Sequence, residues 1–268
     1  MRNQFQYTIR ATTIGLLAVL AACADGEKTD DGPATAAATS QQPSTAPSAQ
    51  PSGDRINLAN CAQDTNGRVF FQVGKSVLGV PAPQIRDAIP TSLRPPLTKE
   101  DVKKELKSQA AAGGGCLNKP IAASLLVIQD DFGHPLLDGR VGLLGVPPQG
   151  LTAGFAEVTR NLQKNPTQNC RKVADNLIGC VGTETRGNVE TQVMYVITTD
   201  TSQNMSSGGP LSARCVLKDG EVQGCNLVDQ LDGNVAFDAT LKAGKYTVEG
   251  LRTARETAIA KVNALRAR

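Results

Sequence analysis

Cysteines have the clearest covalent chemistry in this chain of 268 residues, which contains seven of them. Segments 170–180 and 215–225 each begin and end with a cysteine and carry a turn-prone pair at the centre, such as Asp219-Gly220. Asp-Gly is a strong hairpin signal, and a hairpin folded at its centre brings its end residues within reach of a disulfide. We therefore predict a disulfide within each segment and a third by elimination, namely Cys170–Cys180, Cys215–Cys225 and Cys61–Cys116.

The stretches that follow these two segments are also alike. Gly-Asn-Val occurs after both, at residues 187–189 and 233–235, and each copy leads into an apolar run. The pattern indicates either a weak internal repeat or two hairpins that use the same turn chemistry. Both interpretations stay open at the level of the sequence.

Few other side chains have the spacing that catalysis or metal binding requires. His134 is the only histidine, and its position beside Pro135 is typical of a turn residue. The sequence has no G-x-S-x-G motif, no calcium-loop pattern and no C-x2-C pair. We predict no catalytic residue, no metal and no cofactor; the opposing hypothesis is a hydrolase that uses His134 or an acid. The acids that could act in pairs or bind calcium are Asp130, Asp131, Asp229, Asp232 and Asp238.

The seventh cysteine stands at the end of an N-terminal segment with the pattern of an export signal. Residues 1–22 join a basic head to an apolar stretch that is too short to span a bilayer comfortably. The stretch ends in Leu20-Ala21-Ala22-Cys23, which resembles the lipobox of bacterial lipoproteins. The resemblance implies that residues 1–22 are removed and that Cys23 carries acyl chains, which anchor the protein in a lipid bilayer.

The segment after the lipobox predicts a tether. Residues 23–55 are rich in Ala, Thr, Ser, Pro and Gln and have no bulky apolar side chain, so we expect them to be disordered. A chain of this length reaches about 100 Å when fully extended. Ala24 in place of Asp implies, by analogy with lipoproteins of cells with two membranes, an outer-membrane location facing the periplasm or the cell surface. In a cell with one membrane the protein would lie on its outer face.

Charge and composition exclude several classes of partner. The chain has 28 Lys and Arg against 25 Asp and Glu, and removing residues 1–22 leaves 26 basic residues. Aromatic residues make up only 3% and tryptophan is missing. Neither the charge nor the aromatic content is typical of a nucleic-acid-binding protein, so we expect this protein not to bind nucleic acid.

The elements that must position the cysteines are strands with a few helices around them. Alternating and apolar runs predict most strands, and Thr98 and the glycines at 113–115 delimit one helix. The pattern predicts a mainly β, α+β fold with disulfide-stapled antiparallel hairpins, an N-terminal α+β part at 56–118 and a β-rich part at 119–268. The expected elements are a hairpin at 68–80, strands at 121–129, 140–144 and 192–198, a helix or strand at 151–164, and helices at 98–112 and 248–268.

Two stretches of the second half resemble immunoglobulin-like β-sandwich modules. Residues 130–143, DDFGHPLLDGRVGL, resemble the opening hairpin of bacterial immunoglobulin-like domains. Residues 232–248, DGNVAFDATLKAGKYTV, resemble the closing strands of carboxypeptidase-regulatory-like and collagen-adhesin B-type domains. The resemblance implies a sandwich that serves as a scaffold or binding module and has no catalytic residues.

These features together favour a binding protein over an enzyme. We expect a lipid-anchored module of the bacterial cell envelope that contacts another protein. A concrete version is an inhibitor or immunity protein that neutralises a toxin or a hydrolase. The alternative is a structural or assembly lipoprotein bound to the cell wall or to an envelope machine.

Overall fold

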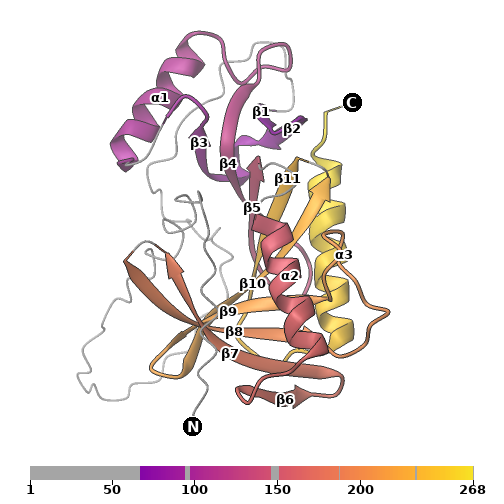
Figure 1. Ribbon diagram of the computed structural model, residues 1–268. Coiled ribbons are helices and arrows are strands. Elements are labelled where there is room, and N and C mark those ends of the chain that lie inside the picture. Colours follow the sequence, from indigo (N-terminus) through magenta and orange to yellow (C-terminus); the bar gives the residue numbers. More distant parts are fainter. Residues whose placement is uncertain (1–66, 94–96, 146–150, 187, 233, 268) are drawn as a thin grey trace, which may run out of the picture.

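The computed structural model describes residues 67–93, 97–145, 151–186, 188–232 and 234–267, and these residues form one mainly β body. Figure 1 shows its strands and helices. The predicted signal segment, Cys23, the predicted tether and Cys61 lie outside the described residues. The helices are α1 (Lys99–Ala111), α2 (Leu151–Lys164) and α3 (Val248–Ala264), with a short 3-10 turn η2 (Ala82–Gln84). The strands are β1 (Arg68–Val73), β2 (Ser76–Pro81), β3 (Ile85–Pro90), β4 (Ile121–Gln129), β5 (Leu137–Gly145), β6 (Cys170–Ala174), β7 (Leu177–Arg186), β8 (Val189–Thr198), β9 (Ser212–Lys218), β10 (Glu221–Asp232) and β11 (Val235–Leu241).

All eleven of these strands belong to a single sheet, in the order β2-β1-β4-β5-β11-β10-β9-β8-β7-β6, with β3 paired to β4. The β1–β4 pair is parallel and the other pairs are antiparallel. Ala123 of β4 pairs with β1 and β3, whereas Leu125 pairs with β5 and β3. Strands β1 and β5 therefore follow one another along the same edge of β4. The sheet thus runs through both parts predicted at 56–118 and 119–268.

Turn chemistry explains the N-terminal elements. The predicted hairpin at 68–80 is confirmed, with Gly74 at a φ of +57° in its turn. A side chain at Gly74 would come within 2.5 Å of the backbone oxygen of Asn234, so only glycine lets this turn abut the β10–β11 connection. The predicted first helix is confirmed as well, because Thr98 and Asp101 form a reciprocal capping box at the start of α1.

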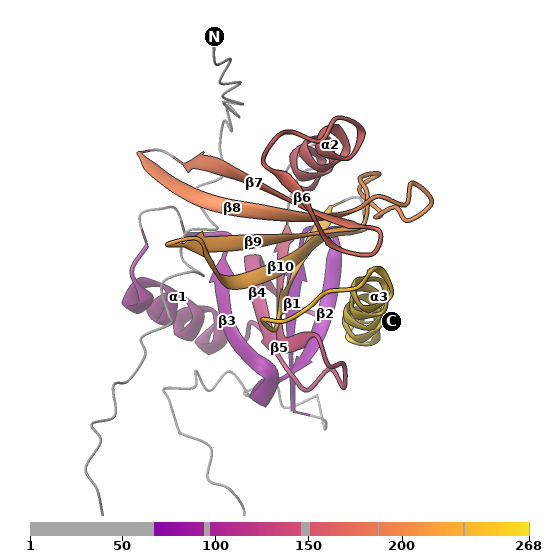
Figure 2. The ribbon, with the colours of Figure 1, turned by 90° about the horizontal axis from the view of Figure 1, so that it is seen from below.

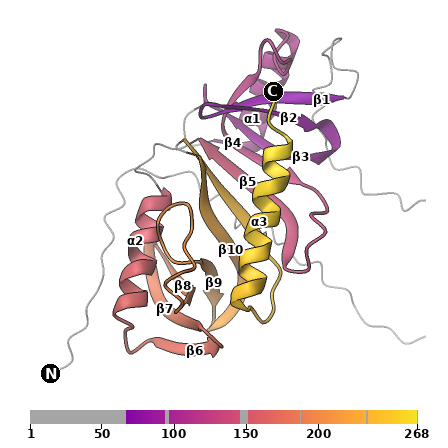
Figure 3. The ribbon, with the colours of Figure 1, turned by 90° about the vertical axis from the view of Figure 1, so that its right-hand side faces the viewer.

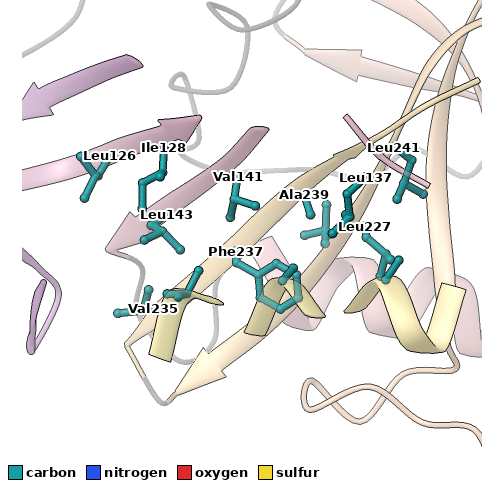
Figure 4. Packing of buried hydrophobic residues seen from close by; sticks show 14 of the residues in the cluster. Leu126, Ile128, Leu137, Val141, Leu143, Leu227, Val235, Phe237, Ala239 and Leu241 are labelled. Atoms are coloured by element: carbon teal, nitrogen blue, oxygen red, sulfur yellow. The ribbon is translucent and has the colours of Figure 1, made fainter. Parts of the chain in front are cut away.

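Helices α2 and α3 lie on opposite faces of the β7–β10 region, as Figures 2 and 3 show from two directions. Segment 151–164, which the sequence left between helix and strand, is helix α2. Its Phe155 ring is 5.9 Å from the ring of Tyr195 in β8. On the other face the predicted C-terminal helix is confirmed, and its apolar stripe packs in one cluster with Leu227 and Phe237 (Figure 4). The stripe consists of Leu251, Ala254, Ala258 and Val262, all buried.

Both predicted hairpin disulfides are present. Cys170 lies directly opposite Cys180 in the β6–β7 hairpin, and Cys215 lies opposite Cys225 in the β9–β10 hairpin. Cys116 is also disulfide-bonded; the predicted Cys61–Cys116 pair cannot be followed because Cys61 lies outside the described residues.

Segments 170–180 and 215–225 have the same local topology, but their disulfides lie on opposite faces of the sheet. Each hairpin is followed by a third antiparallel strand, giving β6-β7-β8 and β9-β10-β11. Cys180 pairs with Tyr195, whereas Cys215 pairs with Met194, the next residue of β8. Successive residues of a strand point to opposite faces, so one disulfide lies on the α2 side of the sheet and the other on the α3 side.

An immunoglobulin-like sandwich is not confirmed. The strands form one hydrogen-bonded sheet with helices on its faces. The stretch that resembles closing strands supplies β11, but Val248 begins helix α3 after the cap at Thr247. The hydroxyl of Thr247 accepts a hydrogen bond from the Gly250 amide, and an N-cap of this kind starts a helix.

Candidate functional site

The ends of two neighbouring hairpins project from the body on the side away from α2 and α3 (Figures 1 and 2). One end joins β7 to β8, and the other joins β9 to β10. The last pair between β8 and β9 is Gln192 with Leu217, so residues 189–191 extend beyond the β8–β9 ladder. The two ends are therefore separate at their tips. We call the surface between them the hairpin-tip surface; it comprises Glu190, Thr191, Gln192, Leu217, Asp219, Gly220 and Val222.

A hollow of about 590 Å³ lies within this surface and opens to solvent. Leu217 forms its apolar part, and Val222 lies opposite Leu217 in the β9–β10 ladder. Val222 is 37% exposed although it sits in a strand. The residues that line the hollow are Glu190, Thr191, Gln192, Leu217, Asp219 and Gly220.

Among the described residues, only four large apolar side chains are exposed, and Val222 is one of them. Fully burying a valine-sized side chain is worth about 1.5–3 kcal/mol, so a partner that covers Val222 gains free energy. Val189 is 64% exposed at the start of β8, but alternation places it on the opposite face from Glu190. Val222 and Leu217 are therefore the apolar centre of the hairpin-tip surface.

The turn between β9 and β10 holds its shape through backbone conformation. Asp219 and Gly220 both have positive φ, at 54° and 81°. Two successive residues of this kind form the hairpin turn whose twist matches that of the paired strands. The sequence signal Asp-Gly thus predicts this turn correctly, and the turn places the Asp219 side chain on the rim of the hollow.

A partly buried ion pair ties the bases of the two hairpins together. Arg214 of β9 donates from Nε and Nη2 to the two carboxylate oxygens of Glu184 in β7, both at 2.8 Å. The hydroxyl of Tyr195 in β8 donates to the same carboxylate at 2.6 Å. Burial lowers the pKa of Arg214, but the hydrogen bonds and charge of Glu184 outweigh it and hold this pKa above its ordinary value. Three adjacent strands are therefore linked just behind the tips.

His134 and four of the acids noted in the sequence hold turns and helices; these acids are Asp130, Asp131, Asp229 and Asp232. The fifth acid, Asp238, is buried on β11. His134 accepts the Leu136 amide at Nδ1, so its Nε2 carries the proton and donates to Thr253 of α3 at 3.0 Å. Asp131 accepts the Gly133 amide within its own turn. In the described part of the chain, no three His, Cys, Asp or Glu residues come close enough together to hold a metal ion.

Asp229 accepts more hydrogen bonds than Asp130, Asp131 or Asp232. It is fully buried on β10 and accepts the amides of Ser206, Ser207 and Gln230 together with Nε of Arg255, the last at 2.6 Å. Arg255 belongs to α3, so the carboxylate joins this helix to the loop between β8 and β9. From α2, Arg160 donates to the Gly208 carbonyl of the same loop. The loop is thus fixed by helices on both faces of the sheet.

Sequence reasoning did not identify the hairpin-tip surface. The Asp-Gly turn was visible, but Val222 and Glu190 became candidates only when the register placed them around Leu217. The one available signal was the polar run at 183–192, in which every residue except Gly187 and Val189 is polar. A strand with polar residues on both faces is expected to extend beyond the core. Of the sequence-predicted site residues, Cys215 and Cys225 cross-link the β9–β10 hairpin, whose end forms part of this surface, whereas Cys170 and Cys180 cross-link the edge hairpin β6–β7.

Comparisons with known proteins supply no relative. The chain matches no protein-family model, no curated protein and no solved structure. Among the described residues, no helix combines the length and the apolar character needed to cross a membrane. The function therefore has to be argued from the surface itself.

Proposed function

We propose that this chain is a lipid-anchored protein of the bacterial cell envelope that binds another protein through its hairpin-tip surface. The observation that carries the proposal is an open hollow between two rigidly based hairpins, with the exposed aliphatic side chain of Val222 next to its lining residue Leu217. A concrete form of this function is inhibition or immunity, in which the partner is a toxin or a hydrolase.

The stiffness of the base supports a binding role. The Glu184–Arg214 pair and the Cys215–Cys225 disulfide fix the hairpins before any partner arrives. A surface that is already ordered loses little conformational entropy on binding, so more of the contact energy appears as affinity. Asp131, Asp229 and His134, by contrast, are engaged in hydrogen bonds that hold the fold, which favours a binding protein over a hydrolase.

The proposed anchor agrees with such a role. An acylated Cys23 followed by an extended tether would let the body search a volume near the membrane while its local concentration stays high. Mass spectrometry of the purified protein tests the anchor directly. We expect residue 23 to be the mature N-terminus with acyl chains attached, and C23S to release the protein from membranes.

Binding is tested by isolating the membrane-anchored protein from its own envelope after mild cross-linking. We expect one protein at a fixed ratio to it. Val222→Asp should abolish the recovery, because it places a charge in the apolar centre of the hairpin-tip surface. Val173→Asp is the matched control, since Val173 is 43% exposed on strand β6, outside the hairpin-tip surface.

Two outcomes contradict the proposal. Equal recovery with both variants would mean that binding does not use the hairpin-tip surface. Sedimentation of the protein with purified peptidoglycan, without a protein partner, would favour the alternative role in cell-wall attachment or assembly.

A further inference from the structure

The geometry of the hairpin-tip surface points to the chemistry of its partner: we infer that the hollow receives a protein segment with an aliphatic side chain flanked by lysine or arginine. This inference rests on the binding function proposed above and specifies what is bound. It follows from three features of the surface, namely its apolar centre, the two acids that line the hollow and the direction of the neighbouring Lys218.

The apolar centre selects an aliphatic side chain. Leu217 lines the hollow and is 9% exposed, and Val222 beside it is 37% exposed. The hollow of about 590 Å³ is open to solvent, so a side chain of the partner can enter it. An apolar group of the partner that covers Val222 removes its exposed surface from water and contacts Leu217 beside it.

The residues that line the hollow include two acids and no base. Glu190 and Asp219 line it from the two different hairpins, and both are exposed. Lys218 neighbours Leu217 in β9 and so points to the opposite face, where Glu221 is its cross-strand partner. The lining of the hollow is therefore acidic. Complementary charge steers such a partner and selects it over acidic ones.

The same charges disfavour the two other candidate occupants. A second copy placed hollow to hollow would set Glu190 and Asp219 against the same acids of its partner. The chain's own segment 24–55 contains five acids and two bases, so it is acidic as well. A basic protein segment is the occupant that the charges favour.

Photo-cross-linking in the intact envelope tests the inference on the full, anchored protein. A photoreactive residue replaces Val222, and the same residue at Val173 serves as the control. The probe is the photoreactive group itself, and the cross-linked peptide is sequenced. We expect a segment that contains an aliphatic residue within a few positions of lysine or arginine.

Removal of the rim charge provides the second measurement. The double variant Glu190→Gln and Asp219→Asn keeps the shapes of both side chains, and asparagine tolerates the positive φ at 219. We expect the cross-link yield at position 222 to fall at least about tenfold, as expected when a complementary charge contact is lost. Asp138→Asn with Glu157→Gln removes the same charge from exposed positions elsewhere and should leave the yield unchanged.

The outcomes separate this inference from the proposed function. A cross-link to an acidic or uncharged segment, or an unchanged yield in the double variant, overturns the inference and leaves protein binding intact. No cross-linked protein at position 222 beyond that at position 173 overturns both.

Discussion

The β6–β7 and β9–β10 hairpins share cysteine spacing and turn chemistry but differ in what surrounds them. β9–β10 lies inside the sheet with β8 and β11 on its two sides, and both of its cysteines are fully buried. β6–β7 ends the sheet, and three successive residues of β6, from Arg171 to Val173, are exposed. The same local device therefore stabilises a core in one place and protects an edge in the other.

The difference shows that the sequence of a hairpin determines its turn and its disulfide. The strands and helices around the hairpin determine how much it contributes to the free energy of unfolding. The edge strand carries Arg171 and Lys172, and charges of this kind discourage pairing with another molecule. The interior hairpin carries the hairpin-tip surface, which needs a fixed base. Three predictions test this contrast.

The largest effect is expected from the acids attached to the two hairpins. Asp229→Ala on β10 leaves Arg255 and two loop amides without their acceptor, and breaking a buried ion pair costs about 3–5 kcal/mol. Asp175→Ala in the edge hairpin removes an exposed pair with Lys172 and should leave stability nearly unchanged. Urea denaturation of both variants measures the difference, and similar losses would contradict the contrast.

Replacing the disulfides should show an intermediate difference. Both close loops with a sequence separation of 10, so the entropic part of their stabilisation is the same, at roughly 3 kcal/mol. C215A/C225A also leaves a void where two fully buried sulfurs packed, which adds about 1 kcal/mol or more. Calorimetry should therefore show a lower melting temperature for this variant than for C170A/C180A. The reverse order of melting temperatures would mean that the disulfide of the edge hairpin contributes more to stability than that of the interior hairpin, and would contradict the contrast.

The smallest effect concerns acid. Asp232 ends β10; burial raises its pKa, but hydrogen bonds from Asn234, Ser76 and Arg266 outweigh this and hold the pKa below its ordinary value of 3.8. A carboxyl with a lowered folded pKa stabilises the protein above its unfolded pKa, and the stabilisation is lost as the pH falls through the folded value.

We therefore expect Asp232→Asn to reduce stability at pH 7 by no more than about 1 kcal/mol and to flatten the loss of stability below pH 4. Unfolding curves from pH 7 down to pH 2 provide the measurement. Asp138→Asn, at an exposed position elsewhere on the body, is the control. An identical acid profile for wild type and Asp232→Asn would show that this carboxyl does not titrate with folding.

Local features of the fold could be predicted from the sequence because short-range chemistry determines them. The Thr98 cap, the Asp219-Gly220 turn and the stripe from Leu251 to Val262 each specify an element within a few residues. The pairing of β1 with β4 could not be predicted in this way. It depends on contacts between residues that are about fifty positions apart, such as Phe71 with Ile121.

The candidate site was harder to predict for the same reason. Leu217 and Glu190 line the hollow from two strands and Val222 adjoins it from a third, and only their register brings them together. The disulfide at the base of the β9–β10 hairpin was predictable, because Cys215 and Cys225 lie within a single hairpin. Sequence therefore identified the support of the hairpin-tip surface and not the surface.

The outer edge of β2 is completed by the last residues of the body. The amide of Gly79 donates to the carbonyl of Leu265, and the amide of Ala267 donates to that of Val77. The partners of β2 on this side thus lie about 190 positions further along the chain. During synthesis the hairpin of β1 and β2 keeps this side open until residues 265–267 have been made, so its own pairing precedes the closure of its edge.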